Sequence, residues 1–198
     1  MLVWLGGCST AQSAAESPPP DQVPTAVPSV IDPGEAAPTM TTLPVTMAAS
    51  PPVRVRIPAI GVDSRLIRLG LEPNGELEVP LGAFPAGWYT GAPTPGELGP
   101  AVIAGHVRWN TTPGVFAGLT RLKPGDEVTV RRRDGSAAVF RVSRVARFDK
   151  ATFPTSVVYG DIDHAGLRLI TCGGLDKAQG RYDANVVVFA DLVGLRGV

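Results

Sequence analysis

Three residues of the chain have side chains that could together carry out acyl transfer: Cys172, His106 and Arg181. A thiolate is a nucleophile that can form a covalent acyl intermediate. A histidine can protonate the amine that leaves from such an intermediate. A guanidinium stays charged and donates hydrogen bonds in a fixed fork, which suits a clamp on a substrate or on an oxyanion. These residue types together indicate attack of a thiol on a carbonyl carbon.

Each of the three residues also has a simpler interpretation. Cys172 ends an apolar run, and a free cysteine there often only packs. However, the two residues that follow it, Gly173 and Gly174, would let a substrate backbone approach closely. His106 also ends an apolar run, where it could be a hydrogen-bonded core residue, and Arg181 could be a surface loop residue. Composition alone leaves both interpretations open.

His164, the other of the two histidines, lies in the polar stretch 161–166. We interpret it as solvated, with catalytic acid as its alternative role. Two separated histidines and no cysteine pair provide no metal-binding spacing. The sequence also lacks a phosphate-binding loop and a G-x-S-x-G nucleophile elbow. We therefore expect neither a metal nor another cofactor.

The chain has two cysteines, Cys8 and Cys172. A disulfide between them is one alternative, but a small disulfide-stabilised domain would carry more cysteines. Leu5-Gly6-Gly7-Cys8 resembles the end of a bacterial lipoprotein signal, in which the cysteine is lipidated. The apolar start is shorter than the ~20 residues that span a bilayer and lacks a basic beginning. We expect residues 1–8 to be the remnant of a signal or lipoprotein anchor, with Cys8 as its lipidation site.

Residues 9–52 are rich in Pro, Ala, Ser and Thr, which prevents long helices and provides no apolar period for a core. We expect a disordered spacer there. The net charge of zero is unevenly divided. Four acidic and no basic residues precede Arg54, so residues 1–52 carry −4, and the remainder, with 18 basic and 14 acidic residues, carries +4. This small and scattered excess does not indicate a nucleic-acid-binding protein.

Residues 53–198 are long enough to bury a core without a metal or a disulfide. Short β-prone runs separated by Gly and Pro turns, with little helical period, indicate an all-β barrel or sandwich. A bulge is expected around Arg144, where the apolar alternation fails. One helical turn is expected at 115–119, and loops at 82–100 and 173–180. The expected strands are 53–57, 65–69, 76–80, 100–106, 127–133, 137–148, 167–172 and 185–190.

Several motifs of this domain together resemble a bacterial sortase over residues 53–192. They are Ala104-Gly105-His106, Lys123-Pro124-Gly125-Asp126, Leu169-Ile170-Thr171-Cys172 and Arg181, in that order and spacing. The strings 169–174 and 185–190 are similar to those of the class F sortases of actinobacteria. The resemblance implies an eight-stranded β-barrel with short helical turns. It also implies that the domain at 53–198 is a sortase catalytic domain behind the spacer.

The resemblance further implies a cysteine transpeptidase that cleaves a Leu-Pro-X-Thr-Gly-type sorting signal between Thr and Gly. Cys172 would be the nucleophile that forms a thioacyl intermediate, and His106 would protonate the leaving amine. Arg181 would hold the substrate and the oxyanion. In many sortases the arginine directly precedes the last strand. Asn185 occupies that position here, four residues after Arg181.

The implied partners are surface proteins that bear a C-terminal sorting signal and an amine of a peptidoglycan precursor. The implied location is the extracytoplasmic face of the cell membrane, where an N-terminal anchor would hold a monomeric enzyme. Two other functions stay open. One is a cysteine protease that uses water as the acceptor, and the other is a non-catalytic β-barrel binding module.

Overall fold

The computed structural model describes residues 45–176 and 181–197. Cys8 and most of the expected spacer lie outside these residues, so the lipidation site stays an expectation. Residues 47–50 already contact the barrel that follows. The Met47 amide donates to the Gly96 carbonyl over 2.7 Å, and the Ser50 amide donates to the Thr94 hydroxyl over 3.0 Å.

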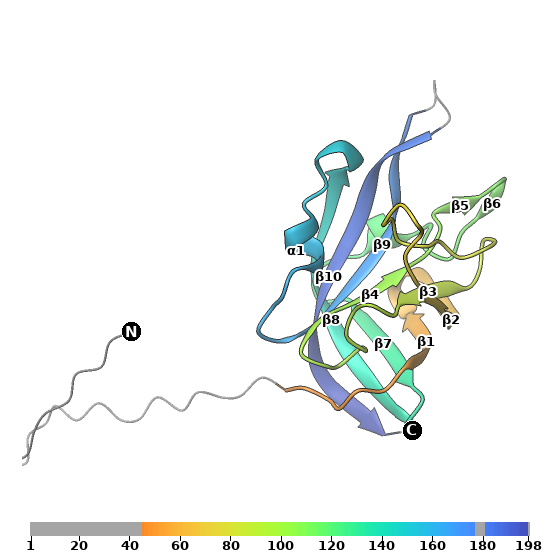
Figure 1. Cartoon of the computed structure of the whole chain (residues 1–198). Coiled ribbons are helices and arrows are strands. Elements are labelled where there is room, and N and C mark those ends of the chain that lie inside the picture. The colour runs from red at the N-terminus through yellow and green to blue at the C-terminus, as the bar shows by residue number, and fades with distance from the viewer. Residues whose placement is uncertain (1–44, 177–180, 198) are drawn as a thin grey trace, which may run out of the picture. The chain divides into compact units, whose positions relative to one another are not determined.

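Eight strands form a closed barrel in the order β1-β2-β3-β4-β9-β10-β8-β7 (Figure 1). All neighbours are antiparallel except β2 with β3 and β4 with β9, which are parallel. The all-β prediction and the eight-stranded barrel are therefore confirmed. The strands are β1 (Pro52–Ile57), β2 (Val62–Leu69), β3 (Ala86–Tyr89), β4 (Gly99–Ala104), β7 (Glu127–Arg132), β8 (Ser136–Asp149), β9 (Ala165–Asp176) and β10 (Arg181–Gly197).

A two-stranded hairpin and four short helical segments complete the described part of the chain. The hairpin consists of β5 (Arg108–Trp109) and β6 (Thr112–Pro113). The segments are the 3-10 turns η1 (Pro58–Ile60), η2 (Leu119–Arg121) and η3 (Lys150–Thr152) and the helix α1 (Thr155–Tyr159). Within residues 45–176 and 181–197, no helix is long and apolar enough to cross a membrane.

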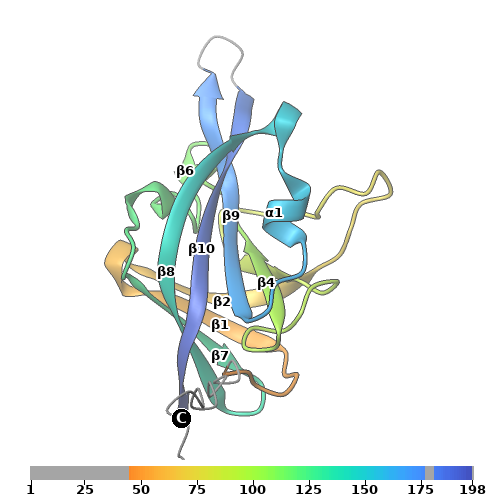
Figure 2. The same cartoon turned by 90° about the vertical axis from the view of Figure 1, so that its left-hand side faces the viewer.

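The core lies inside the barrel, and its residues alternate along the strands. Val55 and Ile57 of β1 are fully buried. Arg54 and Arg56, which alternate with them, point outward and bind Asp63. β4 is buried on both faces, since Val102 belongs to a second apolar cluster outside the barrel. That cluster also contains Val158 of α1, and Figure 2 shows α1 beside β9 and β4. A strand covered on both faces has a continuous apolar sequence.

Three predictions about the elements need correction. Residues 76–80 form no strand and contribute only an isolated bridge between Leu71 and Leu77. The strand that pairs with β2 is instead β3, inside the stretch expected to be a loop, where Gly87 lies so close to Leu69 that a Cβ would clash. The loop expected at 173–180 is also shorter, because β9 continues to Asp176 and β10 begins at Arg181. In each case the pairing of strands that are distant in the sequence outweighed the local preference of the residues.

The expected bulge near Arg144 is present. Phe189 of β10 pairs with Arg144 and Ala190 pairs with Val142, so Ser143 is the extra residue of β8. The helical turn expected at 115–119 lies slightly later, as η2 at Leu119–Arg121.

Candidate active site

Cys172 lies in the second half of β9. The β9–β10 hairpin projects from one end of the barrel (Figure 1). It is a half-buried free thiol in the described part of the chain. Two residues before it, Ile170 pairs with Ala104 of β4, and Leu169 pairs with Ile103. The apolar run therefore serves to anchor the strand in the sheet, and the thiol emerges where the burial ends.

His106 reaches the same place because the chain after β4 continues along β9. The Gly105 amide donates to the Ile170 carbonyl over 3.1 Å, and the Thr171 hydroxyl donates to the Gly105 carbonyl over 2.7 Å. Ala104 pairs with Ile170, so the chain after β4 runs along β9 toward Cys172, and His106 lines the same cavity as Cys172. Gly114 holds the His106 backbone from the other side, since a Cβ there would lie 2.1 Å from the His106 carbonyl oxygen.

The His106 ring has one fixed partner. Its Nε2 lies 2.8 Å from the Pro80 carbonyl oxygen, and the Trp109 ring lies 5.0 Å away at an angle of 57°. A carbonyl oxygen can only accept, so Nε2 carries a proton. This contact leaves Nδ1 as the nitrogen that can exchange a proton with a substrate.

Two cavities meet at Cys172. We name the first, of about 500 Å³, the His106 groove. Besides Cys172, its titratable side chains are those of Glu76, His106, Lys150 and Tyr159. The lining residues of the His106 groove are Gly75, Glu76, Leu77, Val79, Ala104, Gly105, His106, Lys150, Phe153, Thr155, Tyr159, Ile170, Thr171, Cys172 and Asn185. Burial raises the pKa of the Tyr159 phenol, and the nearby Tyr89 contributes in the same direction, so Tyr159 is a neutral donor there.

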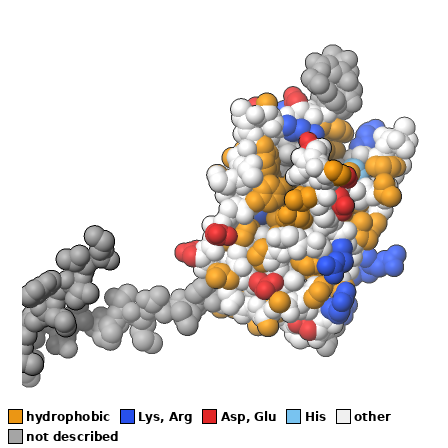
Figure 3. Space-filling view, viewed as in Figure 1, with side chains coloured by type: hydrophobic (Ala, Val, Ile, Leu, Met, Phe, Trp, Pro, Cys, Tyr) orange, Lys and Arg blue, Asp and Glu red, His pale blue; other side chains and the backbone are white. Residues whose placement is uncertain are grey.

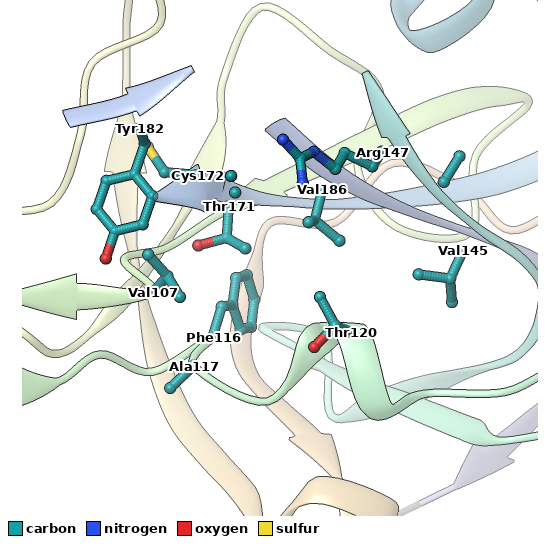
Figure 4. A pocket seen from close by; sticks show the side chains of 13 residues that line it. Val107, Phe116, Ala117, Thr120, Val145, Arg147, Thr171, Cys172, Tyr182 and Val186 are labelled. Atoms are coloured by element: carbon teal, nitrogen blue, oxygen red, sulfur yellow. The ribbon is translucent and has the colours of Figure 1, made fainter. Parts of the chain in front are cut away.

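We name the second cavity, of about 370 Å³, the Phe116 cavity. Figure 4 shows Cys172 and Tyr182 at one end of its lining, Val145 at the other, and Arg147 and Val186 between them. It is mostly apolar. Arg147 provides a guanidinium that lies close to Gly174, whose φ of 65° favours glycine. Arg147 also pairs with Asp183 over 3.2 Å.

The face of the molecule shown in Figure 3 carries many apolar side chains between α1 and the β5–β6 hairpin. Exposed apolar residues occur on the long segment between β2 and β3, which includes Val79, Leu81 and Phe84. Val79 lines the His106 groove, so the groove borders an apolar surface suited to an extended peptide.

The two other residues singled out in the sequence, Arg181 and His164, have the following places in the structure. The backbone of Arg181 begins β10 opposite Asp176, so Arg181 is not a loop residue, but its side chain lies outside the described residues. His164 directly precedes β9, far along that strand from Cys172. It contacts the carboxylates of Asp163 at 3.0 Å and Asp191 at 3.1 Å. The hydrogen bond from His164 lowers the pKa of the Asp163 carboxyl.

Sequence reasoning did not identify the contributions of Pro80, Tyr159 and Arg147 to the site. No local signal marks them, because each approaches Cys172 from a distant segment. Among the described residues, no group of three or more His, Cys, Asp or Glu side chains could hold a metal ion.

Comparisons with known proteins identify the family and the fold of this domain. The family model of the sortase domain matches residues 55–193. A sortase from Actinomyces oris is 22% identical, with a TM-score of 0.57 over 79% of this chain and 89% of that one. A Clostridium perfringens sortase D5 transpeptidase is 22% identical, with a TM-score of 0.54 over 73% and 79% of the two chains.

Sortase A from Listeria monocytogenes is 18% identical, with a TM-score of 0.55 over 76% of this chain and 92% of that one. These solved structures share the barrel. No curated protein matches the chain in a sequence search. The family model covers most of the chain and includes Cys172, His106 and the strands that hold them, so this protein belongs to the sortase family.

Proposed function

We propose that this protein is a cysteine transpeptidase that cleaves a Leu-Pro-X-Thr-Gly-type sorting signal between Thr and Gly and transfers the protein to a cell-wall amine. The observation that carries this proposal is that His106, just after β4, and Cys172, on the adjacent strand β9, line one groove of about 500 Å³. Membership of the sortase family agrees with it.

In the first half-reaction, the Cys172 thiolate attacks the Thr carbonyl carbon. A C–S bond forms, and one electron pair of the C=O bond moves to the oxygen. The tetrahedral intermediate collapses to a thioester as the C–N bond breaks, and His106 gives its Nδ1 proton to the leaving amine. The Pro80 carbonyl retains the Nε2 proton and stabilises the imidazolium before this transfer.

In the second half-reaction, an acceptor amine attacks the thioester. The new C–N bond forms, the C–S bond breaks, and the proton of the amine passes to His106. Arg181, at the beginning of β10, would hold the substrate and the oxyanion. Arg147 is a second candidate guanidinium, since it lines the Phe116 cavity with Cys172.

The proposal extends to the class F type of sortase, to substrates that are surface proteins with a C-terminal sorting signal, and to a peptidoglycan-precursor amine as acceptor. It also extends to a monomer at the extracytoplasmic face of the membrane. There, lipid on Cys8 and the spacer that precedes Met47 would hold the catalytic domain away from the bilayer.

The test uses the full chain, a fluorogenic Leu-Pro-X-Thr-Gly peptide and triglycine as the amine, beside the Cys172→Ala variant. We expect cleavage at Thr-Gly in the protein with Cys172 and a triglycine adduct by mass spectrometry. Cleavage to the free acid alone, even with excess amine, would indicate a protease. A folded protein that binds the peptide without cleaving it would indicate a binding module.

A further inference from the structure

Asn185 lies directly across the sheet from Cys172. It is a residue of β10, and its Cα is the register partner of Cys172 on β9. Residues that face each other on antiparallel strands have their side chains on the same face, with Cβ atoms about 4.5–5.5 Å apart. The half-buried Asn185 side chain also lines the His106 groove together with His106 and Cys172.

The strand order β4-β9-β10 places His106 and Asn185 on opposite sides of the strand that carries the thiol. His106 follows β4 by two residues, and Gly105 before it hydrogen-bonds to Ile170 and Thr171 of β9. Asn185 is level with Cys172 on the β10 side. A carbonyl carbon bonded to the sulfur therefore has a proton donor for the leaving amine on one side and a carboxamide on the other.

The geometry points to Asn185 as a catalytic residue whose side-chain N–H groups stabilise the oxyanion that forms when Cys172 attacks a carbonyl. This inference deepens the proposed function and rests on Cys172 acting as a nucleophile. When the C–S bond forms and the C=O electron pair moves to oxygen, the oxygen gains a negative charge. A carboxamide N–H at a fixed position stabilises that charge without reorganising, and a single such donor is typically worth about 10²–10³ in rate.

The packing of β10 fixes the backbone from which the Asn185 side chain projects. Its neighbours along the strand, Ala184 and Val186, are buried on the other face. Across the sheet on β8 its register partner is Phe148, whose ring contacts Phe153 and Phe189 edge-on. In the described residues, Asn185 is the one carboxamide that lines the His106 groove.

The test compares two reactions of the same thiol. Acylation of Cys172 by p-nitrophenyl acetate passes through an oxyanion: the C–S bond forms and p-nitrophenolate leaves with its electron pair. Alkylation by iodoacetamide forms the C–S bond as iodide leaves, with no oxyanion. Both rates are measured on the full chain with Cys8→Ser, so that Cys172 is its one thiol. The ratio of the two rates isolates oxyanion stabilisation from the reactivity of the thiolate.

We expect Asn185→Ala to lower the acylation rate about 100-fold while the alkylation rate changes less than about twofold. Asn185→Asp keeps the shape of the side chain but replaces the donor with a carboxylate, so it should lower the acylation rate at least as much. Asn110→Gly is the matched control. It removes a carboxamide at a position with φ of 51°, which glycine adopts readily, and Asn110 lines neither cavity.

Equal changes of both rates in Asn185→Ala and Asn185→Asp, or acylation within about threefold of the parent, would overturn the assignment. So would a parent protein whose Cys172 is alkylated but never acylated. Peptide transfer, measured on the same proteins, tests the proposed function separately. If the parent fails to transfer the peptide but the two Asn185 variants lose acylation, the oxyanion role stands and transpeptidation falls. If the parent transfers the peptide but the two variants leave the ratio of acylation to alkylation rates unchanged, transpeptidation stands and the oxyanion role falls.

Discussion

The His106 groove and the Phe116 cavity share Cys172 but differ in what else they offer. The groove contains an imidazole, a phenol, an ammonium, a carboxylate and a carboxamide, whereas the cavity combines Val, Ala and Phe side chains with two threonines, the Tyr182 phenol and one guanidinium. The thiol thus lines both cavities, but an imidazole lies in only one of them. This difference favours the His106 groove as the place of the proposed reaction.

The largest effect is expected at the residue that both cavities share. Cys172→Ala removes the nucleophile and should lower peptide transfer by roughly 10⁴-fold or more. Transfer is measured by mass spectrometry with triglycine as the acceptor. The melting temperature should stay close to that of the parent, because the half-buried thiol fills little of the core. Activity that survives in this variant would show that a different residue is the nucleophile.

His106→Gln tests the acid of the groove. Glutamine can keep a hydrogen bond to the Pro80 carbonyl but cannot deliver a proton to an amine. We expect a loss of about 10²–10⁴ in kcat/KM for amide substrates. A thioester substrate, whose leaving group needs no proton, should recover part of the loss. An equal loss for both substrates would contradict the acid role.

The two candidate guanidiniums, Arg147 in the Phe116 cavity and Arg181 at the beginning of β10, can be compared directly. Arg181→Ala should lower kcat/KM about 10²-fold if Arg181 stabilises the oxyanion. Arg147→Ala should cost less than about tenfold, because exposed pairs such as Arg147 with Asp183 contribute little. Steady-state kinetics of both variants with the same peptide make the comparison. A larger loss for Arg147 would move part of the chemistry to the Phe116 cavity.

The smallest effect is expected from substitutions that fill one cavity or the other with a larger side chain. Ala104→Leu adds a larger side chain at the base of the His106 groove and should raise KM about tenfold, while kcat changes little. Ala117→Leu adds the same atoms to the Phe116 cavity, where Ala117 is exposed, and should leave KM unchanged. Thermal melting of both variants controls for overpacking. The opposite pattern of KM values would place the substrate in the Phe116 cavity.

The sequence by itself determined the fold class and the strands that lead to the candidate residues. The apolar runs that end at His106 and Cys172 are largely buried strands, and the expected strands at 127–133 and 137–148 correspond to β7 and β8. These features could be predicted because alternation and turn chemistry are local properties of the chain. The same local logic explains why residues around Arg144 correctly indicated the bulge at Ser143.

Only the tertiary structure decided which groups share a site. Residues 76–80 alternate like a strand but form a wall of the groove, and β3 forms in a Gly- and Pro-rich stretch, because β2 and β4 provide its partners. His106, and not His164, shares a groove with Cys172 because β4 pairs in parallel with β9, and the place of Asn185 depends on the register of β9 with β10. Register is set by packing across the whole barrel, which no local stretch of sequence encodes.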